Sequence, residues 1–218
     1  FGFPAPIILA LMINEVKNSA FKRTVQTITY MPYFISMVVM CGLLKTFCMQ
    51  DGLFSQIAMA FGGSGQNFLA NPDYFRTIYV LSDIWSGIGW NSIIYLAALS
   101  SIDQEQYEAA RVDGANRFKQ MIHITLPGLV PTIMVLFILR MGNILNVGYE
   151  KILLLYNSAT YITADVISTY TYRLSFGGSG NPMYSKSTAI GLFNTIINVF
   201  FLMLTNMISK KATDAGLF

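Results

Sequence analysis

The sequence predicts an all-α membrane protein that crosses the bilayer several times. Its 218 residues are 54% hydrophobic and only 11% charged, and the mean hydropathy is +0.51. Soluble domains carry about 25% charged residues, so a single soluble core is excluded. The apolar residues gather into stretches, and each crossing of a bilayer needs about 20 of them.

Five stretches along the chain are apolar enough to be read as spans. The first, at about 1–13, is too short to cross alone, and we expect it to be the visible end of a longer helix. The other spans are expected at about 28–48, 76–100, 129–147 and 188–208. Pro32 lies near the start of its segment, where a proline is tolerated in a helix.

The loops between the spans differ in composition. Loop 49–75 is rich in Gly, Asn and Asp, loop 101–127 is polar, and loop 148–187 is long enough for a short helix near 165–173. Loop 148–187 also carries many aromatic residues. These favour either a protein-binding surface or a belt at the membrane surface.

The Lys and Arg counts orient the chain across the membrane. Alternating spans place segment 14–27, loop 101–127 and the C-terminal end on one side. That side holds Lys17, Lys22, Arg23, Arg111, Arg117, Lys119, Lys210 and Lys211, against Arg76, Lys151, Arg173 and Lys186 on the other. Because cytoplasmic loops carry the excess of positive charge, loop 101–127 is predicted to be cytoplasmic.

The polar stretch between the third and fourth spans is itself built to be helical. Asp103 can cap a first helix, and Gln106 can reach back in a capping box. Gly114 permits a sharp turn. A second short helix is expected from Arg117 to Ile122, stopping before Pro127.

The same stretch carries a spaced motif: Glu108-Ala109-Ala110, then Gly114, then Ile124-x-Leu126-Pro127. This spacing resembles the complete EAA loop of ABC-importer permeases, which is the cytoplasmic coupling helix that sits in a groove of the ATPase subunit. Four further stretches resemble the carbohydrate-uptake branch, especially its oligo- and polysaccharide permeases: PAPIILALMINEVKN, QTITYMPYFIS, IGWNSIIYLAALSSI and TAIGLFNTIIN. Together they cover most of the chain.

The resemblance implies a single transmembrane domain with a type I ABC-importer permease (MetI-like) core, with one more transmembrane helix preceding the five visible here. Such a subunit forms half of a translocation pathway in the bacterial plasma membrane, for a sugar oligomer or polysaccharide delivered by an extracellular substrate-binding protein. The implied partners are two ATP-binding cassette subunits and a second, non-identical permease. ATP and Mg²⁺ would bind to the ATPase, and no cofactor is expected in this chain. The implied coupling residues are Glu108, Ala109, Ala110, Asp113, Gly114, Arg117, Leu126 and Pro127.

Two alternatives stay open on sequence alone. One is a permease of the same architecture for another solute, such as an amino acid or phosphate. The other is a channel or membrane scaffold without ATP coupling. The chain lacks a dense basic run for nucleic acid and a nucleophile–base–orienter set for catalysis. His123, the only histidine, has no Cys or carboxylate cluster at metal-ligand spacing.

Polar and aromatic residues within the spans are the candidates for the pathway. Ionisable groups at membrane depth usually face a bundle interior or a water-filled path, and Asp83 and Arg140 lie at similar depths. They can pair with each other, or both can line the outer half of the pathway, or they can form a purely structural pair. Asn143, Asn146 and Asn194 can contact substrate, although hydrogen bonding between helices is the preferred reading. Trp85 and Trp90 can stack on sugar rings, but such residues are also ordinary membrane anchors.

Overall fold

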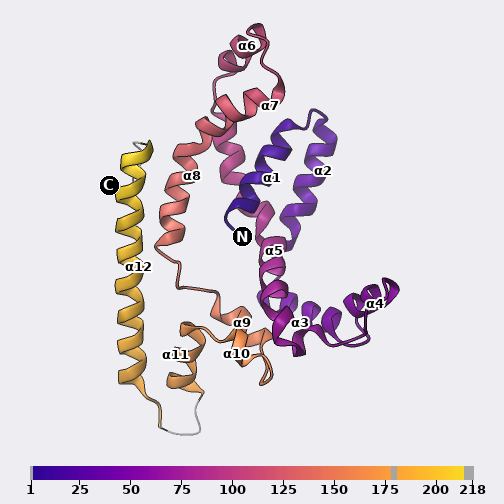
Figure 1. The fold of residues 1–218 in the computed structure, drawn as a ribbon, viewed down its shortest axis with the longest axis vertical. Helices are drawn as coiled ribbons and strands as arrows, with labels where there is room; N and C mark the ends of the chain where they lie inside the picture. The colour runs from indigo at the N-terminus through magenta and orange to yellow at the C-terminus, as the bar shows by residue number, and fades with distance from the viewer. Residues whose placement is uncertain (1, 178–180, 214–218) are drawn as a thin grey trace. The chain divides into compact units, whose positions relative to one another are not determined.

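The computed structural model describes residues 2–177 and 181–213, and every regular element among them is a helix (Figure 1). The α-helices are α1 Pro4–Glu15, α2 Ser19–Tyr30, α3 Met37–Cys48, α4 Leu53–Ala60, α5 Pro72–Ser100, α6 Gln104–Val112, α7 Arg117–Gln120, α8 Leu126–Met141, α9 Tyr149–Leu155, α10 Tyr161–Ala164, α11 Ile167–Phe176 and α12 Tyr184–Thr213. Short 3-10 turns cover Met31–Phe34 and Phe68–Ala70, and a π-helical turn covers Met121–Thr125. The helix expected near 165–173 is confirmed as α11.

The chain forms two compact units. The first contains α1, α2, the part of α5 from Ile84 onward, α6, α7, α8 and the part of α12 from Val199 onward. Its core is built from α1, α5 and α8, whose buried residues are Ala10, Tyr95, Leu99 and Leu129. These apolar faces hold the base of the polar loop in place.

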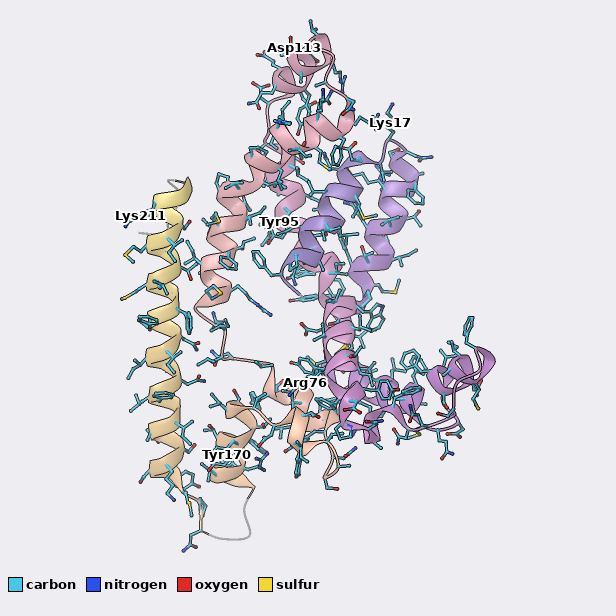
Figure 2. The ribbon with its side chains drawn as sticks, in the orientation of Figure 1. Lys17, Arg76, Tyr95, Asp113, Tyr170 and Lys211 are labelled. Carbon is cyan, nitrogen blue, oxygen red and sulfur yellow. The ribbon has the colours of Figure 1, made fainter. Side chains whose placement is uncertain are left out.

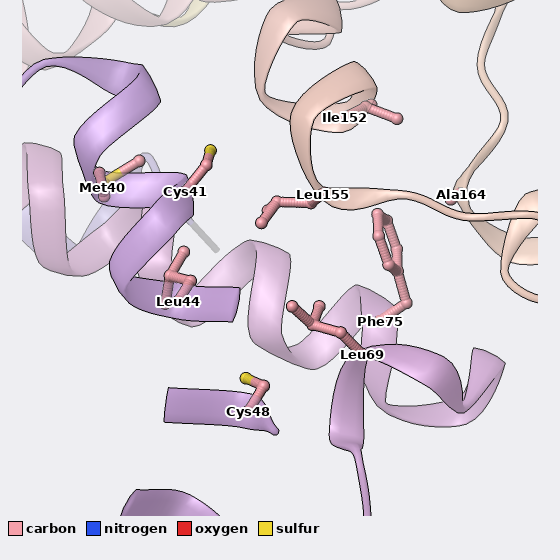
Figure 3. Packing of buried hydrophobic residues seen from close by; sticks show 9 residues of the cluster. All are labelled: Met40, Cys41, Leu44, Cys48, Leu69, Phe75, Ile152, Leu155 and Ala164. Carbon is pink, nitrogen blue, oxygen red and sulfur yellow. The ribbon is translucent and has the colours of Figure 1, made fainter. Parts of the chain in front are cut away.

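The second unit contains α3, α4, the part of α5 up to Asp83, α9, α10, α11 and the first part of α12. Its core joins the inner face of α3 to α9 and to the start of α5 (Figure 3). The buried residues are Met40, Cys41, Leu44, Cys48, Leu69, Phe75, Ile152, Leu155 and Ala164. Loop 148–187 therefore contributes part of a hydrophobic core and is not only a solvent-exposed connection between spans.

The segment 28–48 is not one helix. The α2 helix continues to Tyr30, a 3-10 turn containing Pro32 follows, and α3 begins only at Met37. Proline has no amide hydrogen for the helical ladder, and the Ser36 hydroxyl accepts a hydrogen bond from the amide of Val39 at 3.3 Å, which starts a new helix. The segment expected as polar loop 14–27 is mostly helical for a similar reason, because Asn18 caps α2.

The segment 129–147 ends earlier as a helix than the sequence predicts. The α8 helix stops at Met141, and the chain then makes a turn closed by a hydrogen bond from the amide of Asn146 to the carbonyl of Asn143 at 3.0 Å. The two asparagines therefore do not continue the helical face of Arg140. Loop 49–75 also differs from expectation, since it contains α4.

Three helical segments of the described chain are long and apolar enough to cross a membrane: Met37–Ala60, Arg117–Met141 and Tyr184–Lys211. The 29 residues of α5 would extend about 43 Å at 1.5 Å per residue, which also suffices. Most side chains of the three segments are unburied within the chain, as expected of helices that face lipid or partner subunits.

Candidate functional site

The polar loop after α5 forms a helical elbow of two short helices. The carboxylate of Asp103 accepts a hydrogen bond from the amide of Glu105 at 3.0 Å and caps α6, as predicted. The capping box is not formed, since the structure shows no hydrogen bond from Gln106 back to Asp103. Asp113 lies at the exposed tip of this elbow (Figure 2).

Gly114 makes the turn between the two helices possible. Its φ is +76°, a left-handed conformation that costs other residues about 1–2 kcal/mol. The amide of Ala115 donates to the carbonyl of Ala110 at 2.8 Å, and the amide of Gly114 donates to that of Arg111 at 3.1 Å. This pair of bonds is the Schellman motif, which satisfies the last carbonyls of α6.

The second helix does not stop before Pro127. Asn116 caps α7 through a 2.9 Å bond from the amide of Lys119, and the chain then continues through the π-helical turn Met121–Thr125 into α8. Pro127 is the second residue of α8 and lacks the amide hydrogen that a continuous α-helix would use there. A π turn is wider than an α turn, and such turns occur frequently at functional sites.

A buried hydrogen bond joins the elbow to the base of α8. The hydroxyl of Tyr107, on α6, lies 3.0 Å from that of Thr125, which is only 1% exposed. Thr125 also donates to the carbonyl of Gln120 at 3.4 Å. These two contacts tie α6 to the start of the following span.

An open groove of about 840 Å³ lies between the elbow and the turn connecting α1 to α2. Across it, Arg117 forms an ion pair with Glu15 at 3.6 Å. Both side chains are well exposed, so the pair contributes little stability. It does place one predicted coupling residue, Arg117, against the turn between α1 and α2.

The elbow presents small and apolar side chains to its surroundings. Glu108 and Ala109 are exposed and Ala110 is partly buried, while Leu126 and Pro127 lie exposed at the start of α8. Two further apolar residues, Val112 at 88% and Phe118 at 64% exposed, were not singled out from the sequence. The sequence did contain a signal for them, because large apolar side chains in an otherwise polar loop indicate an interaction surface.

Asp83 has a partner that the sequence did not suggest. Its carboxylate lies 3.6 Å from the Nζ of Lys151 in α9. Lys151 is 1% exposed, donates to the carbonyl of Tyr79 at 3.2 Å, and lies 4.5 Å from the centre of the Tyr79 ring. Burial lowers the pKa of Lys151, and the charge of Asp83 offsets part of that effect. The pairing of Asp83 with Arg140 stays a prediction.

The three asparagines among the pathway candidates are brought together. The side-chain Nδ2 of Asn146 donates to the side-chain oxygen of Asn143 at 3.3 Å, and the side-chain Nδ2 of Asn194 donates to the side-chain oxygen of Asn146 at 3.4 Å. A fourth, Asn198, accepts from the amide of Leu145 at 3.4 Å. The side-chain oxygen of Asn194 is buried without a hydrogen-bond partner in the structure, and such an acceptor calls for one.

The remaining pathway candidates, Trp85, Trp90 and Arg140, belong to the first unit, whereas Asp83 and the asparagines belong to the second. All three side chains are exposed within the chain. Their role in a pathway stays a prediction.

Long apolar helices joined by a polar helical elbow are the features of a membrane protein. The chain belongs to the family of inner membrane components of binding-protein-dependent transport systems, whose model matches residues 2–214. It is 43% identical to Protein LplB of Bacillus subtilis, over 100% of this chain and 68% of the relative. It is 42% identical to the polygalacturonan/rhamnogalacturonan transport system permease protein YteP of the same organism, over 99% and 67%.

Solved structures agree with this assignment. A bacterial ABC transporter involved in the import of the acidic polysaccharide alginate has a chain that is 47% identical, with a TM-score of 0.93 over 98% of this chain and 74% of that one. The bacterial alginate ABC transporter in complex with an alginate pentasaccharide-bound periplasmic protein matches with a TM-score of 0.95, over 100% and 75%. The all-helical permease core and the membrane location expected from the sequence are confirmed.

Proposed function

We propose that this chain is one permease half of an ATP-driven importer for a sugar oligomer or polysaccharide. A second, non-identical permease completes the pathway, and an extracellular substrate-binding protein delivers the solute. Two cytoplasmic ATP-binding cassette subunits bind ATP and Mg²⁺, and this chain holds neither. The observation that carries the proposal is the rigid elbow, in which Gly114 takes up a left-handed conformation and Tyr107 bonds to the base of α8.

In this proposal the elbow is the contact with the ATPase. Ala109 and Ala110 permit a close approach, and Glu108 offers a carboxylate to a cation or a backbone amide on the partner. Val112 and Phe118 add apolar surface that would be buried in a groove. Closure of the two ATPase subunits then moves α6, and the Tyr107–Thr125 bond passes the motion to α8.

The solute class is supported by the relatives. The printed names of relatives and solved structures refer to polygalacturonan, rhamnogalacturonan and alginate, all of them polysaccharides with acidic sugars. We therefore infer that an acidic oligosaccharide is the first solute to test. The alternative left open above, a permease for an amino acid or phosphate, predicts that one of these solutes is taken up instead of a sugar oligomer.

The function is tested by uptake into proteoliposomes that contain the two permeases and the ATPase, with the binding protein outside. Labelled alginate and polygalacturonan oligosaccharides, a neutral maltodextrin, phosphate and an amino acid are compared with and without ATP inside. ATP-dependent uptake of a sugar oligomer is expected. Uptake of any solute without ATP, or no uptake of sugars, would overturn the proposal.

The coupling role is tested by Glu108→Lys and Gly114→Asp. A Cβ atom at Gly114 meets nothing within 4 Å, and aspartate visits the left-handed region more readily than most residues, so the elbow should keep its shape. We expect both variants to insert into the membrane normally, to lose the ATPase during purification and to lose transport. Glu105→Lys makes the same charge change on the same helix and serves as the control. Wild-type uptake in both variants would refute the coupling assignment.

The pathway role of Asp83 and Arg140 is tested by exchanging their charges. A double variant Asp83→Arg, Arg140→Asp that assembles without transporting would place both side chains on the path. Restoration of assembly and transport together would indicate a structural pair. Asn194→Ala is expected to slow uptake, because the unpartnered oxygen of Asn194 is the free acceptor of the asparagine group.

A further inference from the structure

The α4 helix has its polarity reversed relative to a helix on a water-facing surface. The side chain that it buries is polar, Ser55, which is fully buried. Apart from Gln56, the large side chains that it exposes are apolar, namely Leu53, Phe54, Ile57 and Met59, followed by Phe61. A helix at a water-facing surface turns its apolar stripe inward.

Both polar side chains of α4 are hydrogen-bonded to the protein itself. The hydroxyl of Ser55 accepts from the amide of Gln66 at 3.1 Å, which draws the following loop back against the helix. The side-chain amide of Gln56 donates to the carbonyl of Asp51 at 2.9 Å. Apart from Gln56, whose side-chain amide is bonded to the backbone, the exposed surface of the helix consists mainly of hydrocarbon and aromatic groups.

The carbonyls at the C-terminal end of α4 are satisfied as well. The amide of Gly63 donates to the carbonyl of Ala58 at 2.8 Å, and that of Gly62 donates to Met59 at 3.0 Å. Gly62 has a φ of +83°, as the Schellman motif requires at this position. Satisfied backbone groups are a requirement for any segment in contact with hydrocarbon, because no water is present to bond them.

The stretch of sequence that contains α4 has no ionisable side chain. Between Asp51 and Asp73 the sequence contains no Asp, Glu, Lys, Arg or His. The exposed face is also continuous along the chain with that of α3, whose exposed residues include Val38, Val39 and Leu43. Together α3 and α4 make up Met37–Ala60, one of the segments apolar enough to contact the membrane interior.

We propose that α4 lies in the outer leaflet of the bilayer as an anchor parallel to the membrane surface, rather than in a water-exposed loop. Its eight residues extend about 12 Å, which is too short to cross but suits a helix lying at the interface. Asp51 and Asp73 mark the two points at which the chain returns to water. In Figure 1, α4 extends from the end of α3 away from α9 and α10.

Lipid fits this face better than a protein partner does. Protein interfaces surround their apolar centre with a polar rim. The 21 residues from 52 to 72 contain no ionisable side chain that could form the charged part of such a rim. An amphipathic helix that binds the membrane surface usually carries Lys or Arg on its polar face. Here the polar residue Ser55 is instead turned into the protein, where its hydroxyl accepts the hydrogen bond from the amide of Gln66.

The proposal is tested with single nitroxide labels on the protein reconstituted with its partner subunits into nanodiscs. Labels are placed by Ile57→Cys and Phe61→Cys in a background that carries Cys41→Ala and Cys48→Ala. Accessibility to oxygen, which concentrates in lipid, is compared with accessibility to a water-soluble nickel chelate. Leu192→Cys on the exposed face of α12 is the lipid reference, and Glu105→Cys on the elbow is the water reference.

The expected result is that positions 57 and 61 match position 192, with oxygen accessibility several-fold above nickel accessibility. Nickel accessibility equal to that at position 105 would show a water-exposed loop and overturn the proposal. Low accessibility to both reagents would show a protein partner on this face and would overturn it equally. A second variant, Phe61→Lys, is expected to lower the yield of membrane-inserted protein, whereas Phe61→Trp should leave it unchanged.

Discussion

Tyr107 and Thr125 meet at a hydroxyl–hydroxyl distance of 3.0 Å, and this bond connects the two ends of the elbow. Tyr107 lies in the middle of α6, whereas Thr125 closes the π-helical turn just before α8. The contact makes the elbow a closed loop rather than two helices in series. In the coupling role proposed above, such a contact would limit bending between α6 and the start of α8.

Tyr107→Phe should weaken coupling without unfolding the subunit. The change removes one hydrogen bond, worth about 1 kcal/mol, and Thr125 keeps its bond to Gln120. We expect normal assembly with the ATPase but fewer solute molecules transported per ATP hydrolysed. Parallel measurements of uptake and ATPase rate check this, with Tyr149→Phe in another part of the chain as the control. An unchanged ratio would contradict the role assigned to the bond.

Gly89→Ala should destabilise the first unit. A Cβ atom at Gly89 would collide with the carbonyl oxygen of Thr29 in α2 and approach the Tyr30 ring. Overpacking of a core costs about 1–3 kcal/mol, and small residues permit such close helix contacts in membranes. The measurement is the thermal unfolding midpoint in detergent. Gly191→Ala is the matched control, because a Cβ atom there meets nothing within 4 Å, and a normal midpoint for Gly89→Ala would refute the packing argument.

Asp83→Asn should be more harmful than Lys151→Met. Lys151 is buried, whereas the side chain of Asp83 is 50% exposed and water can reach it. Loss of the carboxylate leaves the buried ammonium group of Lys151 without its opposite charge. We expect the free energy of unfolding to fall by about 2 kcal/mol, which is below the range for fully buried pairs. Unfolding midpoints of both variants check the order. The double variant should recover most of the loss, and equal effects of the single changes would argue against the pair.

Acid should loosen α11 through Asp165. Arg173 donates two hydrogen bonds to its carboxylate, at 2.8 and 2.6 Å, and these bonds hold the pKa of Asp165 below its usual value. Because the pKa is lowered in the fold, the stabilisation is present above the unfolded-state pKa of about 3.9 and is lost as pH falls through the folded-state value.

Since both side chains are about a third exposed, the expected effect is only about 1 kcal/mol. Hydrogen exchange of the α11 amides, measured from pH 6 downward, should accelerate beyond the intrinsic change below about pH 4. Asp165→Asn should remove this acceleration and expose α11 at every pH. Protection that is independent of pH in the unaltered protein would contradict the assignment.

The sequence was sufficient for features that depend on local chemistry. Composition predicted the helical membrane class, Asp103 predicted the start of α6, and Gly114 predicted the turn that its φ of +76° confirms. The motif around Glu108 led to the family that the comparison shows. Each of these depends on residues close together in the chain.

Features that depend on distant residues or on helix geometry were not predicted. The ion pair of Asp83 with Lys151 joins positions 68 residues apart, and nothing near Lys151 marks it as buried. The sequence pattern led us to end α7 before Pro127, because a proline usually ends a helix. The π-helical turn allows the chain to continue, and no local pattern indicates such a turn. The early end of α8 has a similar origin, since apolar residues continue to Val147 while the backbone turns at Gly142.

The two caps and the glycine turn have a consequence for the elbow as a mechanical part. Every stabilising contact described for it, from Asp103 to Thr125, is made within the chain. If the elbow docks on the ATPase as proposed, its helices are already formed, and little free energy would be spent on ordering the chain. An elbow held together in this way would move with its partner as one body, and the displacement would reach α8 without being absorbed by bending between α6 and α7.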